Sequence, residues 1–168
     1  MAFLLAALAG SAVADVQSVI QSMLVNVVAS GKVSAPSAVL LKASNSRFGV
    51  LSGSLSVGYW ARTSDGGGGS ITIQASSDFS PSGGPLVSGL IVTCSGATLG
   101  TGCAGQQSLA TSAQTTVLSL PGGACTGGGG LCSNQDPNTV LLMFALPNQP
   151  RYKTGDYSAQ INLTISTM

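Results

Sequence analysis

The chain has 168 residues, of which only 7% are charged: six Lys or Arg, five Asp, no Glu and no His. A net charge of +1 offers no basic surface for nucleic acid or an anionic membrane, and 5% aromatic residues are too few for a base-stacking platform. The 23 glycines are about twice the usual share of about 7%. Together with many Ser and Thr, they favour strands and turns over helices.

The N-terminal stretch has the features of a secretory signal peptide. Residues 2–9 are apolar, and Ala12-Val13-Ala14 before Asp15 fits an A-x-A cleavage site, although the usual basic residues in front are missing. A membrane helix is the alternative, but spanning a bilayer needs about 20 apolar residues. We expect removal of residues 1–14 and a mature chain, residues 15–168, that forms one domain without a membrane span. The expected location is secreted or periplasmic, at the cell surface.

The next segment fits two patterns. Val16, Val19, Ile20, Met23 and Val27 recur at helical spacing, whereas Met23, Val25, Val27 and Ala29 alternate as in a strand. Because β-branched residues dominate, we predict a strand over Ser22–Ala29 and an extended arm over Asp15–Gln21. Such an apolar arm is a candidate donor strand for the sheet edge of another subunit, and an ordinary first strand is the alternative. The donor-strand candidates are Val16, Val19, Met23, Val25 and Val27.

Short apolar segments separated by turn residues follow along the chain. Asp65–Gly69 is predicted to be a hairpin loop. Trp60 falls on the half-exposed face of its strand, where it is either a packing residue or a ligand-groove candidate. The predicted strands are Val39–Ala43, Phe48–Leu51, Ser54–Arg62, Ser70–Ala75, Leu86–Thr93 and Thr115–Leu120.

Two segments near the C-terminus carry the strongest pattern. Every residue of Val140–Leu146 is apolar, so both faces of the segment are apolar. This predicts a central strand covered on both faces. Tyr157–Ser166 alternates with a period of two, and burial of its apolar face would stabilise the fold by roughly 1.5–3 kcal/mol per large residue. Eight or nine short strands predict an all-β protein, an immunoglobulin-like two-sheet antiparallel sandwich whose last strand closes the core. The apolar face comprises Tyr157, Ala159, Ile161, Leu163 and Ile165.

Four cysteines, Cys94, Cys103, Cys125 and Cys132, allow three disulfide connectivities. We favour the two local pairs, Cys94 with Cys103 and Cys125 with Cys132, because each would hold a Gly-rich loop. Structural disulfides are the expected state of an even number of cysteines in an exported chain. The spacing does not fit the C-x₂₋₄-C knuckles of a zinc site.

No motif for catalysis is visible. A Ser-His-Asp triad lacks its base because there is no His, and the five aspartates are scattered through the arm and loops. The tetraglycines at 66–69 and 127–130 lack the G-K-[ST] ending of a phosphate loop, and residues 133–138 lack the residue order of a calcium loop. Asn162-Leu163-Thr164 matches the glycosylation sequon inside a predicted strand. We therefore expect no enzyme activity, no cofactor and no metal.

The segment Gly155–Ile165, with a G-x-Y turn followed by an alternating strand, resembles the C-terminal strand of spore coat protein U-type pilins. The segment Leu24–Ala29 followed by Lys32-Val33-Ser34 looks like the first strand of that family. Related bacterial immunoglobulin-like surface domains end in a similar way. The resemblance implies a sandwich that lacks one strand, which a periplasmic chaperone and then the arm of a like subunit would supply.

Two functions follow as expectations. The first is a non-catalytic structural subunit of a surface fibre or coat, assembled by strand addition. The second is a self-contained extracellular binding module for a glycan or protein ligand, which would use the loops around Trp60 or the Cys94–Cys132 region.

Overall fold

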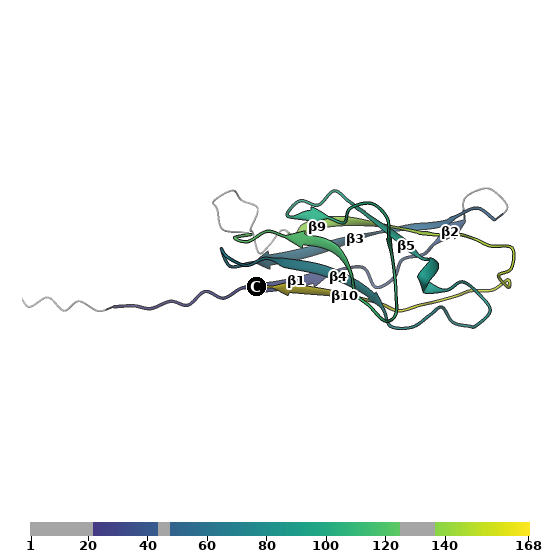
Figure 1. The fold of residues 1–168 in the computed structure, drawn as a ribbon, viewed down its shortest axis with the longest axis horizontal. Helices are drawn as coiled ribbons and strands as arrows, with labels where there is room; N and C mark the ends of the chain where they lie inside the picture. The colour runs from purple at the N-terminus through teal and green to yellow at the C-terminus, as the bar shows by residue number, and fades with distance from the viewer. Residues whose placement is uncertain (1–21, 44–47, 125–136) are drawn as a thin grey trace, which may run out of the picture.

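The computed structural model describes residues 22–43, 48–124 and 137–168. In these ranges the protein is an antiparallel β-sandwich of two sheets, which confirms the predicted fold class (Figure 1). Helical structure in the described ranges is limited to one short 3₁₀ turn, η1 (Val87–Gly89). No helix in the described ranges is long and apolar enough to cross a membrane.

Sheet A contains six strands in the order β1-β3-β9-β5-β7, and the short strand β2 also pairs with β3. The central strand β9 alternates between buried and more exposed positions, because every second residue points into the core. The strands of sheet A are β1 (Ser30–Ser34), β2 (Lys42–Ala43), β3 (Leu51–Arg62), β5 (Ile91–Ser95), β7 (Gln107–Ser108) and β9 (Asn138–Leu146).

Sheet B contains four strands in the order β10-β4-β8-β6. Its strands are β4 (Gly69–Ala75), β6 (Thr101–Gly102), β8 (Thr115–Leu120) and β10 (Ile161–Thr167). β8 has the predicted bounds. The inward residues of β4, β8, β3 and β9 form a fully buried core between the two sheets, with Tyr59, Phe144, Ile71 and Ile73 among its largest members.

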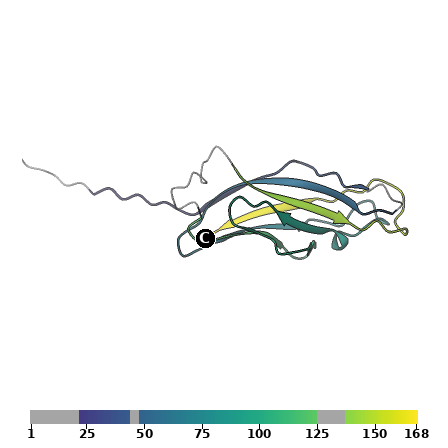
Figure 2. The ribbon, with the colours of Figure 1, turned by 90° about the horizontal axis from the view of Figure 1, so that it is seen from above.

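The structure corrects the prediction for the first strand. Residues 22–29 form no strand and extend away from the sandwich, and the first strand begins at Ser30 (Figures 1 and 2). No described strand edge lies beside this segment, so its alternating residues have nothing to pair with. Asp15–Gln21 lies outside the described residues.

The predicted hairpin at Asp65–Gly69 is also wrong, because the two strands that flank it belong to different sheets. The chain crosses from β3 to β4 here, and its glycines allow close packing: a Cβ on Gly67 would lie 2.5 Å from the Met168 carbonyl oxygen. Periodicity locates strands but does not reveal which sheet they join.

Several strand boundaries differ from the predictions. Of the two short strands predicted around residue 45, only Lys42–Ala43 and Leu51 are in strands, and Phe48 has a positive φ of 56° that interrupts an extended backbone. The predicted strand Leu86–Thr93 begins as η1 and becomes β5 only at Ile91. β10 begins at Ile161, four residues after the predicted start at Tyr157.

Two burial predictions fail for one geometric reason. β9 is central, as predicted, but its outer face is open, so that Leu141 and Met143 are 37% and 41% exposed. Ile161, Leu163 and Ile165 point toward the core, as predicted, but are only half-buried. In both cases a neighbouring layer or strand that would complete the burial is absent from the described residues.

Candidate functional site

A groove with an apolar floor runs along one side of the sandwich among the described residues, with a volume of about 1230 Å³. One wall is the non-strand segment 35–41, which connects β1 to β2, and the other is the extended chain from Tyr157 to Leu163. Core residues form the floor, including Leu55 of β3 and Phe144 of β9. The groove therefore exposes part of the hydrophobic core between the edges of the two sheets.

The wall formed by β10 has an unpaired backbone edge. β10 pairs with β4 on one side, and no described strand pairs with its other side. The Gln160 carbonyl accepts a hydrogen bond from the Ser76 N–H, and the Met168 N–H donates to the Gly68 carbonyl. Since these even-numbered residues direct their backbone groups toward β4, the odd-numbered residues Ile161 and Leu163 direct theirs to the open side.

Side chains on this wall alternate in the same way. Ala159, Ile161 and Leu163 face the groove and are half-buried, whereas Gln160 and Asn162 are exposed on the outer face. Apolar side chains on alternate positions beside an unpaired row of N–H and C=O groups are what an added strand would need.

The opposite wall is held in place by two short strands. Ser34 pairs with Gly58 and Lys42 pairs with Ser52, so the seven residues 35–41 span only the five residues 53–57 of β3. This excess pushes the segment out of the sheet. Val39 and Leu41 pack against the core, whereas Leu40 is 73% exposed. β3 consequently has no strand partner on this side between Gly53 and Val57 in the described part of the chain.

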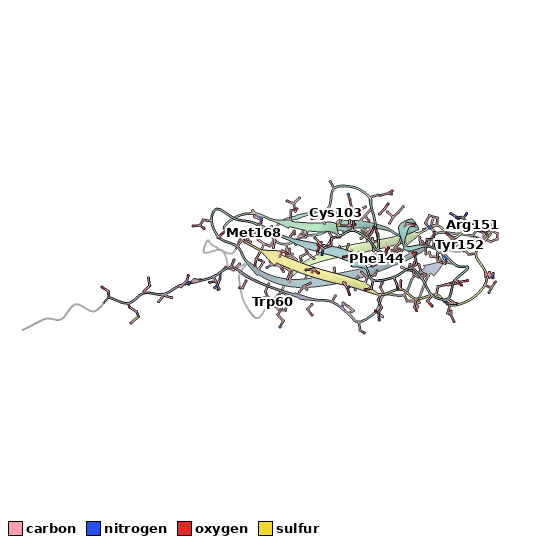
Figure 3. All side chains as sticks on the ribbon, turned by 60° about the horizontal axis from the view of Figure 1, so that its bottom comes forward. Trp60, Cys103, Phe144, Arg151, Tyr152 and Met168 are labelled. Atoms are coloured by element: carbon pink, nitrogen blue, oxygen red, sulfur yellow. A yellow bond between two sulfur atoms is a disulfide. The ribbon has the colours of Figure 1, made fainter. Side chains whose placement is uncertain are left out.

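The mouth of the groove is formed by the β9–β10 connection, where Tyr152, Lys153 and Asp156 lie. Tyr157 anchors this connection: its hydroxyl donates to the Lys153 carbonyl at 2.7 Å. Its ring lies so close to Gly84 that a Cβ there would come within 2.2 Å of it. Figure 3 shows Tyr152 and Arg151 at the end of the sandwich opposite to the chain segment that precedes β1.

That preceding segment is the second unusual surface feature. Met23, Leu24 and Val25 are 91%, 96% and 72% exposed, and Val27 and Val28 are also exposed. Residues 22–29 contain no charged side chain. Residues 22–29 therefore form an exposed apolar segment, which continues the predicted arm and which we include in the term arm. It carries three of the donor-strand candidates, Met23, Val25 and Val27, whereas Val16 and Val19 lie outside the described residues.

Trp60, the ligand-groove candidate, is not part of this groove. It lies on the outer face of sheet A, directly opposite Lys32 of β1, whose ammonium group sits 5.0 Å from the ring centroid. The indole Nε1 is buried and makes no hydrogen bond. Lys32 therefore covers one face of the Trp60 ring.

Cys94 and Cys103 form a disulfide with a Cα–Cα distance of 5.4 Å, as predicted. Cys94 is in β5 of sheet A and Cys103 follows β6 of sheet B, so the bond joins the two sheets. Sequence reasoning assigned it only to a loop, because sheet membership is a tertiary property. Cys125 and Cys132 lie outside the described residues.

Asp78 and Asn162, two of the polar residues considered in the sequence, have structural partners. The Asp78 carboxylate accepts a hydrogen bond from the Val87 N–H at 2.8 Å, at the start of η1. Among the described residues there is no cluster of three or more His, Cys, Asp or Glu side chains that could hold a metal. Asp136 and most of the segment 133–138 lie outside the described residues, and the same is true of Asp15. Asn162 of the sequon is exposed, and its amide donates to the Ser76 hydroxyl.

Comparisons with protein families, with curated proteins and with solved structures found no match in any of the three. The residues that sequence reasoning missed are those of the segment 35–41 and of the mouth. Their signal was weak, because neither region has a regular period.

Proposed function

We propose that the protein is a non-catalytic structural subunit of a secreted fibre or coat, and that subunits assemble by strand addition. The observation that carries the proposal is the apolar groove beside the unpaired edge of β10, in a chain that also presents an exposed apolar arm. Each feature is costly alone: an open edge invites unwanted pairing, and exposed apolar side chains favour aggregation. Together they are complementary.

The energetic argument favours arm and groove as partners. Full burial of a side chain such as Met23, Val25 or Val27 is worth about 1.5–3 kcal/mol, before the cost of ordering the arm and of association. The odd-numbered residues of β10 would also gain backbone hydrogen bonds. A polar or charged ligand would not gain the burial term, because the groove floor consists of core residues such as Phe144 and Leu55.

The positions of the two features favour a linear assembly. The arm leaves one end of the long axis and the groove mouth lies at the other, so an arm from one copy would enter the groove of the next (Figures 1 and 3). Such a head-to-tail contact uses two different surfaces, and it produces an open chain when the rotation does not close. A periplasmic chaperone is the expected occupant of the groove before assembly.

Deletion of residues 15–29 tests the proposal, because β1 begins at Ser30 and the groove is left intact. Light scattering after size exclusion should show oligomers for the secreted full chain and monomers for the deletion variant. Added to the full chain, the deletion variant should shorten the oligomers, since it can accept an arm but not donate one. Oligomers of unchanged size formed by the deletion variant would refute strand addition through this arm.

A further inference from the structure

One turn of the sandwich combines an exposed tip with a tightly packed base. Residues 64–67 form this turn in the crossing from β3 to β4, and the Gly67 N–H closes it by donating to the Ser64 carbonyl at 3.1 Å. Asp65 and Gly66 occupy its two central positions, and both are exposed. A Cβ built on Gly66 would meet nothing within 4 Å. The carboxyl group and the backbone at the tip therefore have room to move.

An aspartate followed by glycine can rearrange without an enzyme. The Gly66 backbone nitrogen attacks Cγ of Asp65, and the new N–C bond closes a five-membered succinimide ring. The amide hydrogen leaves with the hydroxyl of the protonated carboxyl group as water. Water then reopens the ring: cleavage at Cγ restores the aspartate, whereas cleavage at the main-chain carbonyl leaves an isoaspartate, in which the chain runs through Cβ and Cγ. The sum is a rearrangement that consumes nothing.

The other two aspartates in the described ranges lack this combination. Asp78 precedes Phe79, which packs against the core, and a backbone N–H at the start of η1 holds the Asp78 carboxylate. Asp156 precedes Tyr157, whose hydroxyl is bonded within the β9–β10 connection. A side chain on the following residue restricts the backbone, whereas glycine leaves it the widest range of φ and ψ. Asp65 is therefore the described aspartate best able to reach the cyclic geometry.

The base of the same turn is packed against other parts of the chain. The Ser64 N–H donates to the Met168 carbonyl at 2.8 Å, and the Met168 N–H donates to the Gly68 carbonyl at 2.7 Å. On its other side, the Ser64 carbonyl accepts a hydrogen bond from the Gly123 N–H at 2.8 Å. A Cβ on Gly67 would lie 2.5 Å from the Met168 carbonyl oxygen. The turn thus holds Met168, which directly follows β10, and has no spare space where it does so.

An isoaspartate would add one carbon to the main chain inside this packed frame. The carbonyl of Asp65 itself is enclosed, because a Cβ on Gly122 would lie 2.7 Å from its oxygen. We propose that Asp65 is a site of spontaneous isomerisation, and that the isoaspartyl turn releases Met168 and frays the adjoining end of β10. Because no enzyme is needed, the isoaspartyl fraction increases with the age of the molecule.

Ageing the purified full chain in warm neutral buffer tests the first step. Peptide mapping by mass spectrometry with electron-transfer fragmentation locates isoaspartate, and methylation by an isoaspartate methyltransferase measures its amount. Isoaspartate should accumulate at Asp65 at least about tenfold faster than at Asp78 or Asp156, which corresponds to about 1.4 kcal/mol in the barrier. A smaller excess, or none, would overturn the assignment of the site.

Two variants at the tip are matched to the parent chain. Gly66→Ala should fold normally, because Gly66 has no positive φ and its Cβ position is empty, and it should form isoaspartate more slowly. Asp65→Asn reaches the same succinimide with loss of ammonia and supplies material rich in isoaspartate. Isoaspartate formation by Gly66→Ala at the parent rate would contradict the role of the glycine. Failure of both the parent and Asp65→Asn to form it would show that the turn blocks ring closure.

Thermal melting and hydrogen exchange test the second step. Protein enriched in isoaspartate should melt at least about 2 °C below the fresh parent, because one lost hydrogen bond shifts the melting temperature of a domain of this size by about that much. The Met168 and Ser64 amides should exchange faster. Aged Gly66→Ala controls for other changes on ageing. An isoaspartyl form with unchanged melting and exchange would refute the release of Met168. Neither measurement depends on assembly, so the outcome is independent of the proposed function.

Discussion

The two long sides of the sandwich are built in opposite ways. On one side, Cys94 and Cys103 join the sheets covalently, and the loop between β5 and β6 packs over the core. On the other side, β1 and β10 touch only near Gly31, and beyond that contact the core is open along a groove. One side is closed by a covalent bond between the sheets, and on the other the edge of β10 has no strand partner among the described residues.

The closed side also contains a buried hydrogen-bond network. The Tyr59 hydroxyl donates to the Leu99 carbonyl and accepts from the Leu99 N–H. Burial raises the pKa of Tyr59 above its ordinary value, and hydrogen bonds to Leu99 and Thr98 oppose this shift. The contrast teaches that local contacts close the two sheets on one side of the sandwich, whereas the described chain leaves a groove between them on the other.

The largest effect is expected from a charge on the open side. Leu163→Asp places a carboxylate on the half-buried face of β10, where it loses apolar contacts and faces the core. We expect a loss of at least about 2 kcal/mol in the free energy of unfolding, since truncating a core Leu costs about 2–5 kcal/mol and a carboxylate adds desolvation. Urea denaturation and secreted yield measure it. Thr164→Asp, on the exposed face of the same strand, is the control, and equal behaviour of the two variants would contradict the inward placement of Leu163.

On the closed side, the double variant Cys94→Ala/Cys103→Ala should lose about 2–3 kcal/mol of stability, as expected for a short disulfide loop. Urea denaturation of the variant beside the oxidised parent gives the difference. Oligomer formation by the fraction that is still folded should persist, because the groove is on the other side. Loss of assembly without loss of stability would show that the two sides are not independent.

Removing one tyrosine hydroxyl on each side of the sandwich compares the stability of the two sides. Tyr59→Phe leaves the Leu99 N–H and C=O without their partner, which should cost about 1–3 kcal/mol. Tyr157→Phe, whose hydroxyl lies at the exposed mouth of the groove, should cost less. Thermal melting measures both losses, and a greater loss from Tyr157→Phe would contradict the assignment of the stronger hydrogen bonds to the closed side.

Tyr59 also makes the stability of the protein depend on pH. The folded pKa of Tyr59 is raised above the unfolded value of about 10, so its contribution to stability is fully present below about pH 10. It is lost as the pH rises from there through the folded pKa, because the unfolded state ionises first. The stability gap between the parent chain and Tyr59→Phe should shrink above pH 10, and a gap that widens would exclude this mechanism.

The smallest effect is expected on the outer face of sheet A. Met143 is 41% exposed there, and it contributes to neither side of the sandwich. Met143→Ser should change stability by less than about 0.5 kcal/mol, as is usual for surface substitutions, and should leave oligomer size unchanged. A change in oligomer size would point to a second contact between subunits through this face.

The sequence by itself determined the strand content of the protein. Strand-forming residues between turns placed the ends of β8 correctly. A period of two gave the inward residues of β10, since side-chain direction in a regular strand depends on residue parity. Spacing also identified Cys94 and Cys103 as partners. These are local properties, and the sequence states them directly.

Only the tertiary structure decided which strands share a sheet and which edge is left open. The crossing at Asp65–Gly69 looks like a hairpin in sequence, and the alternation of Met23, Val25 and Val27 looks like a paired strand. Whether a strand with the right period finds a neighbour depends on how distant segments pack. For β10, that packing leaves one edge without a strand partner among the described residues, and the groove that forms the candidate site lies beside this edge.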